Sequence, residues 1–282
     1  MISFGGVAYP TAVMGALGLI FGALLAFASI KFFVQTDERV SKIREILPGA
    51  NCGGCGYPGC DGYADGIVSG GAKTSLCAAG GPALARKIAD IMGVAGEESV
   101  PLRAVLKCRG AEKFSARNAV YEGIADCRSA AVLPGSSPNA CPFGCIGLGT
   151  CVKVCLFDAL SIEDGLAFID PEKCVGCGAC VAACPKSVLS LMPKASKVQV
   201  LCNSHWRGPD VKKVCSVGCI GCSLCTKVCP EKAIAMENNL AAIDMAKCTH
   251  CGTCVAKCPS KCIGAVFARA EEIAGSYSAE AV

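Results

Sequence analysis

The chain reads GCIGCSLCTKVC at residues 218–229, and Pro230 follows. Two residues separate Cys219 from Cys222 and Cys222 from Cys225, and Cys229 directly precedes the proline. Bacterial proteins bind [4Fe-4S] clusters with this spacing, in which three thiolates hold one cluster and the fourth holds its neighbour. Because such clusters are held by pairs of runs, the chain should contain further copies of this segment.

A second copy of the segment lies earlier in the chain. Residues 144–155 read GCIGLGTCVKVC and align with residues 218–229 without a gap. Each copy is followed by another run that ends in Cys-Pro. The first copy leads to Cys174, Cys177, Cys180 and Cys184, and the second to Cys248, Cys251, Cys254 and Cys258. This internal repeat predicts two ferredoxin-like units.

Each unit should contain a short β-hairpin between its two runs. In the first unit, residues 159–162 and 166–169 flank the turn signal Glu163-Asp164-Gly165. In the second unit the turn is expected at Asn238-Asn239. Residues of this kind, between short apolar segments, favour tight hairpin turns.

The run pattern predicts the ligands of the second unit directly. One cluster is expected on Cys219, Cys222, Cys225 and Cys258, and its partner on Cys248, Cys251, Cys254 and Cys229. In the first unit, Cys155, Cys174, Cys177 and Cys180 form the equivalent of the partner cluster. Each set crosses from one run to the other, as in two-cluster bacterial ferredoxins.

The other cluster of the first unit departs from the pattern. Leu148 occupies the position of Cys222, and Leu156 replaces the proline after Cys155. Cys141 precedes Cys145 by the same interval as Cys215 precedes Cys219, so we expect it to supply the missing ligand. The expected set is Cys141, Cys145, Cys151 and Cys184. A three-iron cluster without a fourth cysteine is the alternative.

A different cysteine motif precedes both units. Residues 48–60 read PGANCGGCGYPGC, and Cys77 follows later. The expected ligands of one further [4Fe-4S] cluster are Cys52, Cys55, Cys60 and Cys77. Glycines between them allow the backbone to fold around a cluster and direct amide groups toward its sulfur atoms. Residues 82–92 should form an amphipathic helix that closes this domain.

Five cysteines have no place in these sets: Cys108, Cys127, Cys202, Cys215 and Cys262. Val105-Leu106-Lys107-Cys108 is similar to Val200-Leu201-Cys202 at what should be a strand end. The left-over thiols can converge on a sixth cluster, or they can be buried free thiols that pack as small apolar groups. Cys262 is expected to belong to the second class.

Other metals and cofactors fit the sequence less well. The 25 cysteines fall mostly in close runs, unlike the scattered cysteines of secreted disulfide scaffolds. Structural zinc sites use two separated pairs of ligands rather than runs of four. His205 and His250 do not look like ligands, and the sequence lacks the dinucleotide, P-loop and haem-attachment motifs. We therefore expect no flavin, haem or NAD on this chain.

The charge distribution points to protein partners rather than to nucleic acid. The formal net charge is +4, and basic residues concentrate between Ser190 and Cys229. They are Lys194, Lys197, Arg207, Lys212, Lys213 and Lys227, against the single acid Asp210. The segment is either a docking face for an acidic partner or a solvated linker. Nucleic-acid binding is not expected, because aromatic residues do not alternate with the basic ones.

The N-terminus contains a membrane-spanning segment. Residues 7–30 carry no charged side chain and, at about 1.5 Å per residue, are long enough to cross a hydrocarbon core of about 30 Å. A cleaved signal peptide is the alternative, but the apolar stretch is too long and no basic residue precedes it. Lys31, Arg39, Lys42 and Arg44 follow closely, so the cluster domains should be cytoplasmic and the N-terminus outside, in a single-pass arrangement.

The expected fold class is α+β: one transmembrane helix, a small four-cysteine [4Fe-4S] module and two ferredoxin-like 2[4Fe-4S] units. Because aromatic residues make up only 6% of the chain, bound clusters should replace much of the usual core. We expect the membrane anchor to span residues 1–34, the four-cysteine domain residues 35–92 and a connecting α/β segment residues 93–140. The two ferredoxin-like units should span residues 141–192 and 193–264, followed by a tail at residues 265–282.

In the order of these parts the chain resembles the B subunits of Rnf complexes, over nearly its whole length. The four-cysteine module alone is similar to one in corrinoid iron-sulfur proteins. The resemblance implies an electron-transfer subunit of an ion-translocating ferredoxin:NAD oxidoreductase in the cell (inner) membrane.

By this resemblance, the protein would accept electrons from reduced ferredoxin and relay them through five or six clusters toward partner subunits. Those membrane and peripheral subunits would reduce NAD and translocate Na+ or H+. The alternative is a relay subunit of a membrane hydrogenase or formate dehydrogenase. A redox-sensing protein is a more remote third.

Overall fold

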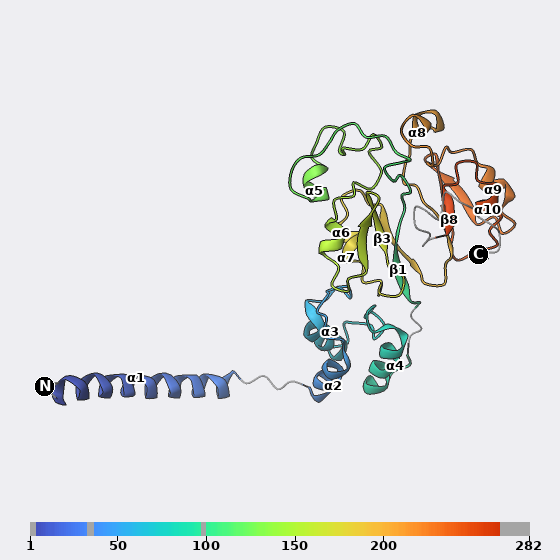
Figure 1. Ribbon diagram of the computed structural model, residues 1–282. Helices are drawn as coiled ribbons and strands as arrows, with labels where there is room; N and C mark the ends of the chain where they lie inside the picture. The colour runs from blue at the N-terminus through green and yellow to red at the C-terminus, as the bar shows by residue number, and fades with distance from the viewer. Residues whose placement is uncertain (1–3, 33–36, 97–99, 266–282) are drawn as a thin grey trace.

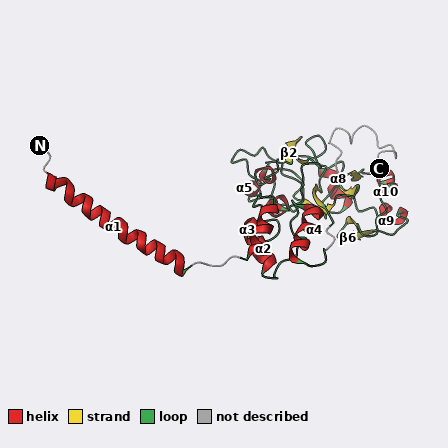
Figure 2. Cartoon of the chain, turned by 90° about the horizontal axis from the view of Figure 1, so that it is seen from below, coloured by secondary structure: helices red, strands yellow, loops and turns green. Residues whose placement is uncertain are grey.

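The computed structural model describes residues 4–32, 37–96 and 100–265 of the chain. It combines helices with short strands, which confirms the mixed α and β class (Figure 1). Helix α1 (Phe4–Lys31) stands apart from the other elements in both views (Figures 1 and 2). Its apolar side chains are exposed, as at Leu19 (78%) and Ile30 (80%).

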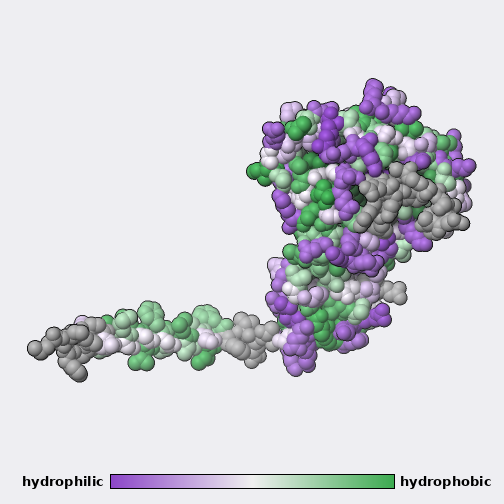
Figure 3. Space-filling view, viewed as in Figure 1, coloured by the Kyte–Doolittle hydropathy of each residue, from purple (hydrophilic) through white to green (hydrophobic). Residues whose placement is uncertain are grey.

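Helix α1 is the one described helix that is long and apolar enough to cross a membrane. The segment Thr11–Lys31 has a mean hydropathy of 2.3, and none of it is buried against the rest of the chain. The exposed apolar surface along this helix is visible in Figure 3. Exposure of this extent suits a lipid environment and would be costly in water.

Helices α2 (Glu38–Ile46), α3 (Gly59–Val68) and α4 (Gly81–Met92) form a small domain after α1. Its core contains Ile43, Tyr63, Ile67 and Ile88, all at most 2% exposed. The Tyr63 hydroxyl donates to the carbonyl of Lys73 over 2.8 Å, which holds the segment before Cys77 against α3. Helix α4 confirms the amphipathic helix expected at residues 82–92.

The rest of the described chain contains four two-stranded antiparallel sheets. The strands are β1 (Leu102–Leu106), β2 (Leu160–Glu163), β3 (Leu166–Ile169), β4 (Leu189–Pro193), β5 (Val198–Val200), β6 (Ile234–Glu237), β7 (Leu240–Ile243) and β8 (Ile263–Ala265). Strand β1 pairs with β4, and β5 pairs with β8. In each unit, therefore, a leading strand pairs with the strand that follows the last cysteine run.

The two expected hairpins are confirmed as β2–β3 and β6–β7. Both turn residues of each hairpin have positive φ, at Asp164 (49°) and Gly165 (74°) and at Asn238 (46°) and Asn239 (66°). Positive φ at both central positions is typical of turns that match the twist of the strands.

Short helices carry the cysteine at the third ligand position of each run. They are α6 (Thr150–Lys153), α7 (Ala179–Ala183), α9 (Leu224–Val228) and α10 (Thr253–Lys257), and two others, α5 (Cys127–Ala130) and α8 (Gly208–Val214), lie outside the runs. The four helices of the runs begin after a left-handed residue: Gly149, Gly178, Ser223 and Gly252. The repeat thus extends from the sequence to the backbone conformation.

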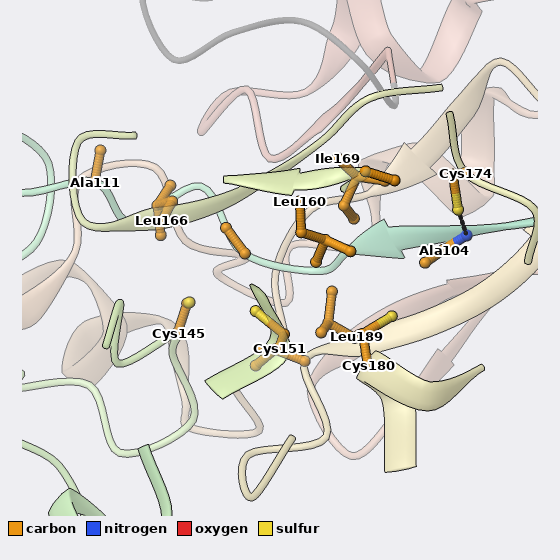
Figure 4. Close-up of a cluster of buried hydrophobic side chains, with 13 residues drawn as sticks. Ala104, Ala111, Cys145, Cys151, Leu160, Leu166, Ile169, Cys174, Cys180 and Leu189 are labelled. Carbon is orange, nitrogen blue, oxygen red and sulfur yellow. Dashed lines mark hydrogen bonds between the residues drawn. The ribbon is translucent and has the colours of Figure 1, made fainter. Parts of the chain in front are cut away.

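The cores of the two units consist largely of cysteines and small aliphatic residues. In the first unit, Leu160 and Leu189 lie among the thiols of Cys151 and Cys180 (Figure 4). Bound clusters would lie among these cysteines and complete the cores.

Candidate iron-sulfur sites

Three of the predicted cysteine sets line separate hollows, each with an empty volume of about 300–340 Å³. The sets are Cys155, Cys174, Cys177 and Cys180; Cys219, Cys222, Cys225 and Cys258; and Cys229, Cys248, Cys251 and Cys254. Within the described chain, no three His, Cys, Asp or Glu side chains converge on a position for a single ion. Thiols spread around a hollow suit a cluster better than one zinc ion with Zn–S bonds of about 2.3 Å.

Backbone amides are directed at the thiols of these sets. The amide of Ala104 donates to Cys174 Sγ over 3.4 Å, a contact drawn in Figure 4. The amides of Ala159 and Ala233 donate to Cys155 Sγ and Cys229 Sγ over 3.4 and 3.3 Å. N–H groups that point at sulfur stabilise the thiolates that a cluster requires, so the donor set fits iron-sulfur ligation.

The N-terminal set also lies together, in the domain formed by α2, α3 and α4. Burial raises the pKa of Cys77, and the nearby charges of Cys52, Cys55 and Cys60 raise it further. The amide of Cys60 donates to Asn51 Oδ1 over 2.8 Å, which orders the loop between these cysteines. The four thiols are therefore neighbours, as their spacing predicts.

A cysteine outside the run pattern, Cys127, lies near the altered set of the first unit. Burial raises the pKa of Cys145 to about 11, and the neighbouring charges of Cys127 and Cys184 raise it as well. Burial raises the pKa of Cys151 to about 12, and Cys145 and Cys127 again contribute. Cys127 is therefore a neighbour of both Cys145 and Cys151, the cysteines on either side of Leu148 in the sequence.

A local hydrogen-bond network fixes Cys127 in this place. Asp126 caps α5 by accepting hydrogen bonds from the amides of Arg128 and Ser129. The amide of Cys127 donates to Thr150 Oγ1 over 2.6 Å, and that hydroxyl donates to Asp126 Oδ2 over 2.9 Å. Helix α5 is thereby joined to the start of α6, which carries Cys151.

The structure groups Cys141 differently from our expectation. It lines a hollow of about 450 Å³ together with Cys108, Cys202 and Cys215, and of its expected set only Cys145 also lines this hollow. The chain turns between Cys141 and Cys145, with the Gly144 amide donating to the Cys141 carbonyl over 3.4 Å. The turn places Cys141 beside Cys202 and Cys215 of the second unit, which line the same hollow. Burial raises the pKa of both of these thiols, and the nearby charge of Cys141 raises it further.

Cys262 is buried beside one of the predicted sets. Its Sγ lies 3.6 Å from that of Cys258, and it also lines the hollow of Cys219 and Cys222. Hydrogen bonds from Cys262 lower the pKa of Cys258 to about 5 and that of Cys219 to about 6, whereas the pKa of Cys262 itself is raised. Cys262 is thus a buried thiol within hydrogen-bond distance of Cys258, an expected ligand.

The sets follow one another closely through the molecule. A Cβ atom added to Gly54 would lie 2.7 Å from the Cys177 carbonyl oxygen, so the N-terminal loop packs directly on the first unit. Within that unit, Cys151 and Cys180 interact electrostatically across the two sets. In the second unit, α10 carries Cys254 and leads directly into Cys258 of the other set.

Both histidines lie within the second unit and outside the expected ligand sets. His205 Nδ1 lies 3.3 Å from the Asn238 carbonyl oxygen. His250 Nδ1 lies 3.7 Å from Cys248 Sγ, and its φ of 59° corresponds to the glycines Gly147, Gly176 and Gly221 of the other runs.

Three family models match these regions. Residues 47–79 match an Fe-S cluster family, residues 167–190 the 4Fe-4S binding domain, and residues 211–259 the 4Fe-4S dicluster domain. Together with the thiol sets, these matches define an iron-sulfur electron-transfer protein with several [4Fe-4S] domains.

The chain is 46% identical over 85% of its length to the B subunit of the Na+-translocating ferredoxin:NAD+ oxidoreductase complex of Acetobacterium woodii, covering 72% of that protein. It is 47% identical to the corresponding subunit of the proton-translocating complex of Clostridium ljungdahlii, over 84% of both chains. The B subunit of the ion-translocating oxidoreductase complex of Methanosarcina acetivorans is 44% identical, with 84% of this chain and 90% of that one covered. The chain therefore belongs to the B-subunit family of ion-translocating ferredoxin:NAD+ oxidoreductase (Rnf) complexes.

Proposed function

We propose that this protein accepts electrons from reduced ferredoxin at its second ferredoxin-like unit and delivers them toward its N-terminal domain. The observation that carries this direction is the exposure of the thiols. Of the 25 cysteines, only Cys222 and Cys251 are exposed, and both belong to the second unit. An external donor can approach a bound cluster most closely there.

The ligand sets support at least five [4Fe-4S] clusters. Four sets follow the prediction from sequence, and the fifth consists of Cys127, Cys145, Cys151 and Cys184. We place Cys127 rather than Cys141 in this set, because Cys127 lies beside Cys145 and Cys151. Bound clusters supply one-electron transfer, while the protein positions them, donates amide hydrogen bonds to their thiolates and limits their contact with water.

A basic surface lies close to the exposed thiols. Lys212 and Lys213 are exposed on α8, and Lys213 pairs with Asp210 over 3.1 Å. Helix α8 starts against the loop between Cys219 and Cys222, since a Cβ atom on Gly208 would lie 2.6 Å from the Ile220 carbonyl oxygen. The basic residues are thus positioned to steer an acidic ferredoxin toward Cys222.

The protein is associated with the membrane, and we propose a single crossing by α1. Lys31, Arg39, Lys42 and Arg44 follow this helix, which favours a cytoplasmic location for the cluster domains and an external N-terminus. The flavin and NAD sites and the ion path would then lie on the partner subunits of the complex.

The test of donor docking is stopped-flow reduction of the full chain, purified in detergent with its clusters, by reduced ferredoxin. The rate should fall as salt rises, because the Debye length shrinks from about 10 Å at 0.1 M to about 3 Å at 1 M. Lys212→Glu/Lys213→Glu should slow reduction at low salt. The matched control is Arg86→Glu/Lys87→Glu, an equal charge change on the exposed face of α4. Equal effects of the two double variants would contradict docking at α8.

A further inference from the structure

A fourth hollow in the ferredoxin-like region is lined by residues of both units, and its cysteines are Cys108, Cys141 and Cys145 of the first unit and Cys202 and Cys215 of the second. Cys108 follows strand β1 and Cys202 follows strand β5, the leading strands of the first and second units. Cys141 and Cys215 each precede the first run of their own unit at the same interval. The four thiols therefore occupy two pairs of equivalent positions in the repeat.

We propose that Cys108, Cys141, Cys202 and Cys215 bind an additional [4Fe-4S] cluster that joins the two ferredoxin-like units. The matched 4Fe-4S domains begin at residues 167 and 211 and include only Cys215 of these four. The inference rests on the proposed function for its electron-transfer role, but the ligand set stands on the geometry alone.

Amide groups approach all four thiols, as they do in the other sets. Cys108 accepts from the amides of Cys145 and Gly110, and Cys202 accepts from those of Cys219 and Ser204. The amides of Phe143 and Gly144 donate to the thiol of Cys141, and those of Val217 and Gly218 donate to the thiol of Cys215. Paired N–H donors stabilise thiolates, whereas a thiol that is only a small apolar core residue does not need them.

The charges around the hollow also favour an anionic occupant. Arg109 is only 6% exposed and lines the hollow, with its guanidinium donating to the Lys261 carbonyl. The Lys186 amine lies near both Cys141 and Cys184, and burial lowers its pKa. No Asp or Glu is among the described residues that line the hollow. A four-thiolate cluster carries net negative charge, which would balance these buried and half-buried cations.

The position of the hollow gives the site its role. The amide of Cys145, a ligand residue of the first unit, donates to Cys108 Sγ over 3.5 Å. The amide of Cys219, a ligand residue of the second unit, donates to the thiol of Cys202. The hollow thus adjoins one expected set of each unit. A cluster here would connect the exposed second unit with the first unit and, through the Gly54 contact, with the N-terminal domain.

The test is the iron and sulfide content of the full chain, loaded with clusters under anaerobic conditions. We expect about 24 irons in the unaltered protein and a loss of about four in Cys108→Ala and in Cys215→Ala. The double variant should lose no more than either single variant, because both residues serve one cluster. Cys262→Ala, which removes the remaining unassigned buried thiol, is the control and should lose none.

Two further measurements guard against variants that merely fold poorly. Cys215→Gly loaded in the presence of a small external thiol should regain the missing iron, since an external thiolate can replace a ligand but not a packing side chain. The paramagnetic resonance signals of the other clusters should persist in every variant. The proposal would be overturned if both single variants kept all their iron, or if the double variant lost twice as much iron as either single variant. It would also be overturned if the external thiol failed to restore iron, or if the site held one zinc per chain.

The same variants separate this site from the proposed function. If the site exists, rapid mixing of Cys215→Ala with reduced ferredoxin should reduce the second unit and leave the first unit oxidised. If ferredoxin reduces neither the unaltered protein nor the variant while the iron losses occur as expected, the donor proposal fails and the site stands. If ferredoxin reduces the first unit of the variant as fast as that of the unaltered protein, the connecting role is overturned.

Discussion

The backbone amide of Cys145 donates a hydrogen bond to the Sγ atom of Cys108 over 3.5 Å. The two residues come from different parts of the first unit, the start of a cysteine run and the end of strand β1. The same relationship recurs in the second unit, where the amide of Cys219 donates to the thiol of Cys202. A motion or substitution at either run should therefore affect the site between the units as well as the cluster of its own unit.

The first prediction concerns the altered set. Cys127→Ser should remove one cluster of the first unit, since its thiol lies beside Cys145 and Cys151. Cys127→Ser combined with Cys184→Ser should lose about four irons, the same as either alone, whereas Cys127→Ser with Cys141→Ser should lose about eight. Iron analysis with paramagnetic resonance checks this. A loss of only four irons in the second combination would return Cys141 to the set of Cys145.

The second prediction concerns Leu148, which stands where the second unit has Cys222. Leu148→Cys should leave a four-iron cluster in place, because Cys127 already provides the fourth thiol. The double variant Leu148→Cys/Cys127→Ser should regain the cluster lost in Cys127→Ser. The measurement is paramagnetic resonance of the reduced protein, which reports four-iron clusters, and of the oxidised protein, which reports a three-iron cluster. A three-iron signal in the oxidised unaltered chain would contradict the four-thiol set.

The third prediction concerns the contact between the N-terminal domain and the first unit. Gly54→Val places side-chain atoms where a Cβ alone would lie 2.7 Å from the Cys177 carbonyl oxygen. Overpacking of this kind costs about 1–3 kcal/mol, so the contact should open and reduction of the N-terminal cluster should slow. Gly71→Ala is the control, because its added Cβ would meet nothing closer than 3.7 Å. Equal rates in the two variants would show that electrons do not pass through this contact.

The fourth prediction concerns Cys262, whose thiol lies 3.6 Å from Cys258 Sγ. Hydrogen bonds to the sulfurs of a cluster favour its reduced, more negative state. Cys262→Val, which copies Val188 at the same position of the first unit, should lower the potential of the adjacent cluster by about 40 mV if about 1 kcal/mol of stabilisation is lost. Cys262→Ser retains a donor and should shift less. A redox titration in which valine and serine act alike would contradict this role.

The fifth prediction concerns iron removal. Cysteines are interspersed among the aliphatic residues in the buried cores of the ferredoxin-like units, whereas the buried core described for the N-terminal domain, with Ile43, Tyr63 and Ile88, contains no cysteine. Chelation should therefore unfold the two units and leave residual protection in α2 and α4. Hydrogen exchange measures both regions at once. Native protection of β2 and β3 in the iron-free chain would show that apolar packing alone holds the units.

Much of this arrangement could be predicted from the sequence, because run spacing is a local property. The gap-free repeat predicted a hairpin between the two cysteine runs of each unit, and the structure has them as β2–β3 and β6–β7. The cysteines of these runs line three separate hollows. The parallel between Cys141 and Cys215 also appears in the structure, since both line one hollow. The spacing could not predict that Cys141 and Cys215 share one hollow, because the turn before Cys145 directs Cys141 toward the second unit.

Cys127 was beyond sequence reasoning for a different reason. It lies in an insertion, roughly residues 116–138, that has no counterpart between Cys202 and Cys215. Its position depends on a hydrogen bond from its amide to Thr150, a tertiary contact with no periodic signal. Asp126 as a helix cap was the one local sign of ordered structure there.

The order in which clusters are reduced tests the central claim most directly. The full chain is mixed with reduced ferredoxin and frozen at successive times, and paramagnetic resonance follows each cluster. A Cys60→Ser variant identifies the signal of the N-terminal cluster by its loss. We predict that clusters of the second unit, with Cys222 and Cys251, are reduced first and the N-terminal cluster last. Reduction of the N-terminal cluster in the earliest sample, ahead of the second unit, would contradict the account.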